Sequence, residues 1–177
     1  MTSSSLTDEP LHPCFCIHCI NSITTLPSCA DGDGTLTLTA TGGSGNYEYS
    51  LDDATNFWQD SNIFDNVPAG IHEVFINDKN GCGVVSKVVA VVGIPKYFTP
   101  NNDSYNDLWG IKGMEKYPTA YVQIFDRYGK LIKYLNKNNP YWDGTFNGYQ
   151  LPANDYWYII KLEDGKPEIR GHFTLKR

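Results

Sequence analysis

Tyr156-Trp157-Tyr158-Ile159-Ile160-Lys161-Leu162 is the strongest β-strand pattern in the sequence. It combines aromatic and β-branched residues, which favour extended strands, and it shows no helical period. The turn residues Glu163-Asp164-Gly165-Lys166 follow it, and Gly171-His172-Phe173-Thr174-Leu175 then has the pattern of a second strand. Together they predict two consecutive strands of a sheet.

The same succession of strand and turn recurs along the rest of the sequence. Residues 121–125 and 130–135 are short strands on either side of Asp126-Arg127-Tyr128-Gly129. Further upstream, residues 35–40 alternate polar and apolar side chains, the period-two pattern of a strand buried on one face. Asn80-Gly81 is a strong hairpin signal because both residues tolerate positive φ, and residues 84–92 form the closing strand.

The composition agrees with a sheet protein made of two small modules. The 177 residues include 16 Gly and 10 Pro between short Val-, Ile-, Tyr- and Thr-rich runs, and 14% of them are aromatic. We therefore predict an all-β chain of two immunoglobulin-like β-sandwich modules in tandem, at residues 29–93 and 97–177. The short joint at residues 93–96 contains Pro95, which predicts modules held nearly end to end.

Residues 1–28 are assigned to an unstructured or foreign leader. Their apolar run is too short and too polar for the core of a signal peptide, so either such a signal lies upstream or these residues are foreign to the protein. A structural zinc site usually needs a matched second pair of ligands, and none follows the first group. That group consists of His12, Cys14, Cys16, His18 and Cys19.

Charge and motifs exclude several classes of function. The net charge of −6 comes without a basic stripe, which argues against nucleic-acid binding, and no apolar run approaches the roughly 18 residues that span a bilayer. No Gly-x-Ser-x-Gly elbow, His-Glu-x-x-His helix or phosphate loop is present, and His72 and His172 fall inside strands. We predict a protein that is not an enzyme and requires no cofactor.

One polar loop is a candidate calcium site. Asn101, Asp103, Asn106 and Asp107 place hard oxygen ligands at short spacing, which suits Ca²⁺, although the bidentate Glu of an EF-hand is missing. The alternative is a set of Asx turns, in which the same side chains accept hydrogen bonds from the loop backbone.

The tryptophans allow a different function. Trp109, Trp142 and Trp157 would form a sugar-stacking platform in a carbohydrate-binding module, or they would simply fill the core of a small sandwich. Trp157 alternates with Tyr156 and Tyr158, so one of these two faces must point outward. An exposed aromatic face would be a docking surface.

Six motifs follow one another along the second module. They are Phe98-Thr99-Pro100-Asn101, Asn106-Asp107-Leu108-Trp109, Phe125-Asp126-Arg127-Tyr128-Gly129, Trp142-Asp143-Gly144-Thr145, Leu151-Pro152-Ala153-Asn154-Asp155-Tyr156 and Gly171-His172-Phe173-Thr174-Leu175-Lys176-Arg177. In this order they closely resemble the gliding-motility-associated C-terminal domain of Bacteroidota, the type B sorting domain of the type IX secretion system. The departures are Asn102, Ser104 and Asn154, where the family usually carries glycine.

The first module resembles the tandem immunoglobulin-like repeats of large gliding adhesins. The shared features are Cys29, the turn Gly42-Gly43-Ser44-Gly45-Asn46-Tyr47, the turn Pro68-Ala69-Gly70 and the closing Asp78-Lys79-Asn80-Gly81-Cys82. His72 departs from the pattern, because such repeats favour Tyr there. The position of Cys29 and Cys82 at either end of the module suits a disulfide in an oxidising compartment, worth roughly 4 kcal/mol in the chain-entropy account.

These resemblances imply an exported cell-surface protein. The partners implied are the type IX translocon and surface-attachment components, with a surface glycan or a host or substratum ligand for the repeat. The residues implied in sorting are Arg127, Gly129, Trp142, Asp143, Gly144, Tyr156, Gly171, Leu175 and Arg177. For Arg127 two roles stay open: contact with the secretion machinery, or a structural contact with Trp142 or Asp143 that Lys would not reproduce.

Overall fold

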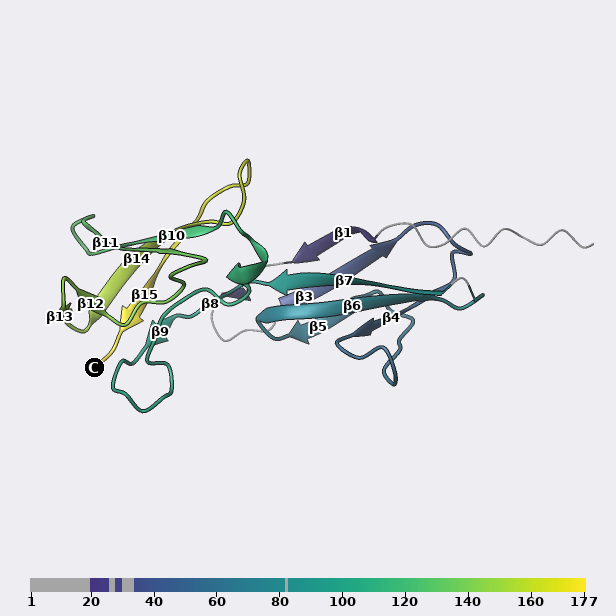
Figure 1. Ribbon diagram of the computed structural model, residues 1–177, viewed down its shortest axis with the longest axis horizontal. Helices are drawn as coiled ribbons and strands as arrows, with labels where there is room; N and C mark the ends of the chain where they lie inside the picture. The colour runs from purple at the N-terminus through teal and green to yellow at the C-terminus, as the bar shows by residue number, and fades with distance from the viewer. Residues whose placement is uncertain (1–19, 26–27, 30–33, 82) are drawn as a thin grey trace, which may run out of the picture.

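The structure is a computed structural model, and it describes residues 20–25, 28–29, 34–81 and 83–177. Two groups of strands follow one another along the long axis of the molecule (Figure 1). Apart from one short 3₁₀ turn, η1 (Met114–Lys116), the regular elements of these residues are all strands. The predicted all-β class of sandwich modules is confirmed.

The first module packs two three-stranded antiparallel sheets against each other. One sheet has the order β1 (Ile20–Thr25), β3 (Gly34–Ala40), β5 (Ile63–Val67), and the other the order β4 (Tyr47–Leu51), β6 (Gly70–Asp78), β7 (Gly83–Val91). Alternate residues of β3 and β6 point inward, as the period-two pattern predicts, and Leu36, Leu38, Val74 and Ile76 are fully buried.

Strand β1 corrects the assignment of residues 1–28 to a leader. Ile20–Thr25 pairs with β3 from Ile20↔Ala40 to Thr25↔Leu36, and β2 (Ser28–Cys29) pairs in parallel with β8 (Gly93–Ile94). Four of the six residues of β1 are β-branched, which suits a strand. The sequence did not predict this strand because Asn21 and Ser22 interrupt its apolar pattern. Pairing with β3 outweighs that interruption. The leader prediction is therefore wrong for residues 20–25 and 28.

The second module is built on one five-stranded sheet. Its order is β11 (Leu131–Asn136), β10 (Tyr121–Phe125), β14 (Asn154–Lys161), β15 (Ile169–Leu175), β9 (Tyr97–Phe98), with only the β15–β9 pair parallel. A two-stranded hairpin, β12 (Thr145–Phe146) and β13 (Tyr149–Gln150), lies at one end. Largely irregular segments cover the inner face of the sheet and supply Trp109, Ile111, Met114 and Trp142 to its core.

The chain passes from one module to the next through direct contacts. The Gly93 and Lys112 backbones exchange hydrogen bonds of 3.1 and 3.0 Å, and the Trp109 indole N–H donates to the Pro95 carbonyl at 2.8 Å. Val92 and Ile94 on either side of Gly93 are buried in the core of the second module. A Cβ on Gly93 would lie 2.3 Å from that of Ala69, so only glycine fits this close approach.

Candidate recognition surface and the sorting motifs

Strand β14 separates a buried aromatic face from an exposed one. Tyr156, Tyr158 and Ile160 point into the core, whereas Trp157 between them is 42% exposed. The alternation predicted from the sequence is therefore present, and Trp157 belongs to the outward face. In the register of the sheet it lies opposite His172 of β15, and their ring centroids are 6.4 Å apart.

A shallow groove of about 670 Å³ runs over this outward face, and we call it the outer groove. It is lined by Phe125, Asp126, Arg127, Gly129, Trp157, Tyr158, Ile159, Arg170, Gly171 and His172. Strands β10, β14 and β15 therefore all contribute to it. On the opposite, core-facing side of β15, a Cβ at Gly171 would lie 2.3 Å from the Tyr158 hydroxyl, so glycine leaves room for this ring.

The turn that carries Arg127 is fixed by Asp126. One carboxylate oxygen of Asp126 accepts hydrogen bonds from the backbone N–H groups of Tyr128 and Lys130, both at 2.9 Å, and Gly129 takes a φ of 79°. Arg127 itself is exposed, and its guanidinium lies over the Tyr128 ring, 5.6 Å from the centroid. The geometry of the turn therefore depends on Asp126 and Gly129, while Arg127 is left at the surface, where it lines the outer groove.

The predicted structural partners of Arg127 are wrong. Trp142 is fully buried and donates its indole N–H to the Thr145 carbonyl at 2.8 Å. Asp143 accepts hydrogen bonds from the Thr145 N–H at 3.0 Å and hydroxyl at 2.8 Å. Partial burial opposes ionisation of Asp143, but these hydrogen bonds outweigh it and hold the pKa of the carboxyl below its usual value.

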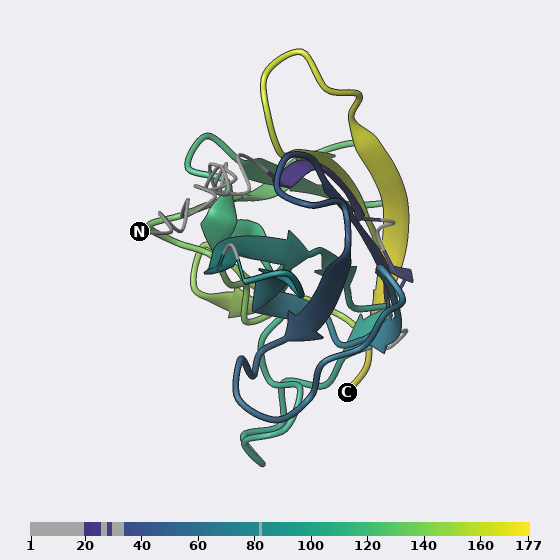
Figure 2. The same cartoon turned by 90° about the vertical axis from the view of Figure 1, so that its right-hand side faces the viewer.

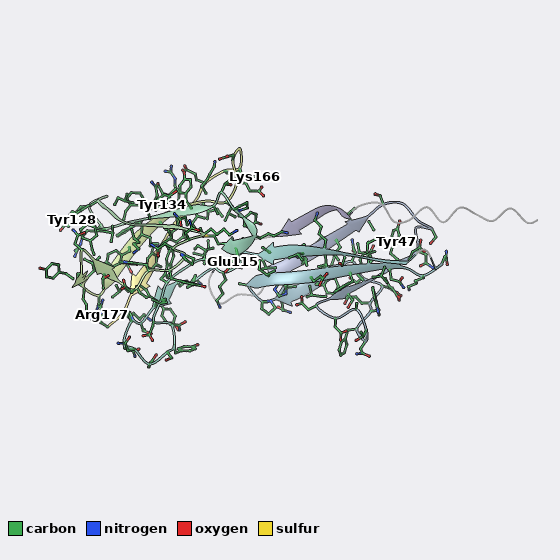
Figure 3. All side chains as sticks on the ribbon, viewed as in Figure 1. Tyr47, Glu115, Tyr128, Tyr134, Lys166 and Arg177 are labelled. Atoms are coloured by element: carbon green, nitrogen blue, oxygen red, sulfur yellow. The ribbon has the colours of Figure 1, made fainter. Side chains whose placement is uncertain are left out.

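Four of the implied sorting residues meet at the far end of the second module. The Arg177 guanidinium donates to the carbonyls of Leu151 at 2.9 Å and Gly144 at 3.2 Å, and Arg177 lies at the end opposite the first module (Figure 3). Gly144 has a φ of 79°, and a Cβ there would lie 2.8 Å from the buried Leu175 side chain. Tyr156 is also buried and donates its hydroxyl to the Pro152 carbonyl at 3.0 Å. These contacts link the end of the chain to the segments before β12 and β14, and the part of these residues in sorting stays a prediction.

The polar loop before Trp109 is closed by its own side chains. Asp107 accepts hydrogen bonds from the backbone N–H groups of Asn101 at 2.9 Å, Asn102 at 2.6 Å and Ser104 at 2.8 Å. Asp103 accepts one from the Tyr105 N–H at 2.8 Å, and its pKa is lowered by hydrogen bonds from the Asn101 side chain and the Tyr105 backbone.

These are the bonds that the Asx-turn alternative requires. Asn102, Ser104 and Asn106 take positive φ values of 64°, 70° and 53°, so the non-glycine residues keep the left-handed backbone of the loop. Within the described part of the chain, no group of three or more His, Cys, Asp and Glu side chains is arranged to hold a metal ion. Calcium binding through Asn101, Asp103, Asn106 and Asp107 stays a prediction.

Of the two alternatives for the tryptophans, the core is correct for Trp109 and Trp142, and the three residues do not form a common sugar-stacking platform. Trp109 and Trp142 are both fully buried, and Trp109 stacks on Phe173 with a centroid distance of 3.9 Å and an interplanar angle of 14°. Only Trp157 of the three is accessible to a ligand. The indole N–H groups of the two buried rings are paired with backbone carbonyls, which explains why such large amphipathic side chains can be core residues.

The first module contains a buried polar clamp formed by Asp78, the first residue of the closing motif. Asp78 is only 1% exposed, and its carboxylate accepts hydrogen bonds from the Ser44 N–H at 2.6 Å and the Asn80 N–H at 3.0 Å. It thereby ties the Gly-rich turn to the end of β6. The available signal was its position: Asp78 follows His72, Val74 and Ile76 on the inward side of the strand.

A second clamp lies at the other end of β6. The two ring nitrogens of His72 are 2.7 Å from an Asp52 carboxylate oxygen and 2.7 Å from the Pro68 carbonyl. The other Asp52 oxygen accepts the Glu73 N–H at 2.8 Å. His72 therefore ties β6 to Asp52 on the neighbouring loop.

Several predictions fall outside the described residues. They concern His12, Cys14, Cys16, His18 and Cys19, and the disulfide between Cys82 and the side chain of Cys29. The disulfide stays a prediction.

Two family models match parts of the chain. Residues 92–175 match the family model of the CHU_C type IX secretion signal domain, and residues 21–56 match that of the SprB repeat. No curated protein sequence matches the chain. No helix in the part of the chain that the structure describes has the length and apolar character to cross a membrane.

Two solved structures share a distant likeness with the chain. One is a biofilm-associated protein BSP domain, with 12% identity and a TM-score of 0.32 over 86% of this chain and 29% of that one. The other comprises extracellular domains 3–5 of Drosophila OTK, with 14% identity and a TM-score of 0.25 over 88% of this chain and 62% of that one.

The fold and the matched families define the class: this is a region of an exported surface protein with a sorting module behind an adhesin-type repeat. Its second module is a type IX secretion signal domain, and its first contains an SprB repeat, as the resemblances predicted. A secretion signal of this kind directs export to the cell surface or the extracellular space, and it implies contact with the secretion machinery.

Proposed function

We propose that the type IX translocon and its surface-attachment components recognise the second module through the outer groove and Arg127. The observation that supports this is the division of the sorting motifs by exposure. Trp142, Tyr156 and Leu175 are buried, and Arg177 is tied to backbone carbonyls, so they maintain the fold. Arg127 is exposed and lines the groove, and no carboxylate pairs with it among the described residues.

We also propose that the described part of the chain acts without catalysis. The ring of His72 is fully engaged between Asp52 and Pro68, and Asp78 is occupied by turn N–H groups. His172 is exposed beside Trp157, a neighbour that provides no general acid or base. The role of these side chains is to hold or present surfaces.

A secretion assay tests the proposal. A reporter protein fused upstream of residues 92–177 is expressed in a host with a type IX system and in the same host without the translocon. We expect the reporter at the surface or in the medium of the first host and in the periplasm of the second. A reporter that stays in the periplasm of both hosts contradicts the proposed function.

A pair of single substitutions tests the surface. Arg127→Ala removes an exposed cation beside the groove, and we expect export to fall about tenfold, in the range of losing one charged interface contact. Lys166→Ala removes an exposed cation at the other end of the module, away from Tyr128 (Figure 3), and export should be unchanged. Circular dichroism of both variants confirms that the fold is kept. Equal export of the two variants would contradict recognition through Arg127.

A further inference from the structure

The ring of His72 lies between two hydrogen-bond acceptors. Its Nδ1 is 2.7 Å from an Asp52 carboxylate oxygen, and its Nε2 is 2.7 Å from the Pro68 carbonyl oxygen. A carbonyl and an ionised carboxylate have no hydrogen to donate, whereas a neutral imidazole has a single N–H. A neutral ring would therefore bring one nitrogen lone pair against an oxygen. Both contacts are hydrogen bonds only when each ring nitrogen carries a proton.

The surroundings of the pair favour the charged ring. His72 is 9% exposed, whereas the side chain of Asp52 is 51% exposed. The second Asp52 oxygen accepts the Glu73 N–H at 2.8 Å, a bond that favours the ionised carboxylate. The negative carboxylate in turn compensates the positive charge of the buried ring, so the shared proton belongs on the imidazole.

Asp52 is the one charged side chain that bonds to this ring within the described part of the chain. The elements packed around the ring carry other charged residues: Glu48 on β4, Asp53 after it, Asp65 on β5, Glu73 and Asp78 on β6, Lys87 on β7 and Lys112 in the second module. Asp53 and Asp65 accept hydrogen bonds from threonine hydroxyls, and Glu73 points to the opposite face of β6 from His72. The proton on His72 therefore depends chiefly on Asp52.

The Pro68 carbonyl belongs to a turn that packs against the joint between the modules. A Cβ on Gly93 would lie 2.3 Å from the Ala69 Cβ, and a Cβ on Gly113 of the second module would lie 3.4 Å from the Gly70 carbonyl oxygen. Figure 2 views the molecule along its long axis, with the first module in front of the second. The bond from the imidazole to this turn therefore holds the part of the first module that meets the second.

We propose that His72 is held as a doubly protonated imidazolium, and that its proton fixes the turn at residues 68–70 against the joint and makes the joint sensitive to pH. When the ring loses a proton, the bond to Asp52 or the bond to Pro68 is lost. Above the ordinary histidine pKa of about 6.5, the folded module then binds up to one proton more than the unfolded chain, so its unfolding free energy should fall as the pH rises. The stabilisation is complete at acidic pH and is lost at alkaline pH.

Nitrogen NMR of the full chain tests the protonation state. The chain is labelled with ¹⁵N-histidine and measured at about pH 7.5, one unit above the ordinary histidine pKa. We expect both ring nitrogens of His72 to carry a hydrogen in the folded chain, and one of them in urea. His72→Gln removes these signals and thereby assigns them. A folded His72 ring with a single N–H overturns the proposal.

An isosteric substitution separates the proton from the hydrogen bonds. In Asp52→Asn the side-chain oxygen still accepts the Glu73 N–H, and the amide donates to Nδ1 of His72. A neutral imidazole then keeps its remaining N–H for Pro68. We therefore expect Asp52→Asn to retain the clamp without the extra proton, and to lose its dependence on pH.

The neighbouring Asp53→Asn is the matched control. Hydrogen bonds from Thr55 hold the pKa of the Asp53 carboxyl below its usual value, so it stays ionised between about pH 6 and 8. Its replacement removes the same charge from the same loop without touching His72. The pH dependence of the unchanged chain should be kept.

Hydrogen exchange at the Gly93 and Lys112 amides, which bond across the joint, provides the measurement. Between about pH 6 and 8, and after correction for intrinsic exchange, we expect opening to increase about tenfold in the unchanged chain and in Asp53→Asn, and not in Asp52→Asn. An equal increase in Asp52→Asn overturns the proposal, as does an increase at β6 with none at the joint. If Asp52→Asn loses its native circular dichroism, His72→Gln takes its place, with the exposed His172→Gln as its control.

Discussion

The two modules are both small sheet structures, but different kinds of side chain stabilise their cores. The core of the first module is largely aliphatic, with Leu36, Leu38, Val74 and Ile76 at its centre. The core of the second is centred on aromatic rings, among them Trp109, which stacks on Phe173, and Trp142. Among the described residues, those that are both polar and buried, Ser50, His72 and Asp78, all belong to the first module.

This difference indicates which substitutions should destabilise each module most. An aromatic core buries large areas per residue, so a few rings account for much of the stability of the second module. A smaller aliphatic core buries less, and the first module adds polar clamps at both ends of β6, at His72 and at Asp78. We therefore expect the second module to fail through loss of a ring and the first through loss of a hydrogen bond.

The largest effect is expected from Trp109→Ala. The substitution removes a fully buried ring that stacks on Phe173 and bonds to Pro95, and it should cost about 3 to 5 kcal/mol of unfolding free energy. Tyr149→Ala, which removes a 78% exposed ring, is the control and should change little. Hydrogen exchange measures the two modules separately through the amides of β14 and β6. Equal loss of protection in both strands would show that the modules unfold as one unit. The two cores would then not determine the stability of their modules separately.

Asp78→Ala should have the next largest effect, and it acts on the first module. It leaves the N–H groups of Ser44 and Asn80 without their acceptor, which should cost about 2 kcal/mol. Asp78→Asn keeps one acceptor oxygen and should lose roughly half as much. Urea unfolding followed by exchange at β6 provides the measurement. A loss below about 0.5 kcal/mol for Asp78→Ala would mean that water replaces the carboxylate and that no polar clamp is needed.

The sequence was sufficient where one local pattern determines one structure. The period-two alternation correctly predicted that β3 is buried on one face and that β14 has one inward and one outward face, because a sheet places successive side chains on opposite sides. Ordered motifs led to the type IX sorting domain, which the family comparison confirmed. The turn at Asp126 and Gly129 could be predicted for the same reason, since its bonds are local.

The sequence was insufficient where residues far apart in the chain decide the outcome. Strand β1 depends on pairing with β3, and its own residues at Asn21 and Ser22 obscure the pattern. The burial of Trp109 and Trp142 depends on backbone carbonyls that tertiary packing brings to their indole N–H groups.

The smallest effect is expected for an exposed carboxylate of the second module, Asp103, which can be compared with the buried Asp78 of the first. Asp103 is the solvent-exposed counterpart of Asp78, and hydrogen bonds from the Asn101 side chain and the Tyr105 N–H hold its pKa below the usual 3.8. Because the folded pKa lies below the unfolded one, these bonds stabilise the loop above about pH 4, and their contribution is lost as the pH falls through the folded pKa.

An NMR titration of the Asp103 carboxyl carbon should accordingly have its midpoint below 3.8. Asn101→Ala removes the largest cause of the shift and should raise that midpoint, whereas Asn138→Ala, in a turn that Asn136 caps, should leave it unchanged. The Tyr105 amide resonance should move with the same midpoint, because its hydrogen bond weakens when Asp103 is protonated. A midpoint at or above 3.8 that Asn101→Ala does not shift would show that the hydrogen bonds to Asp103 are not formed in solution. Of the two carboxylates, only the buried Asp78 would then stabilise the fold.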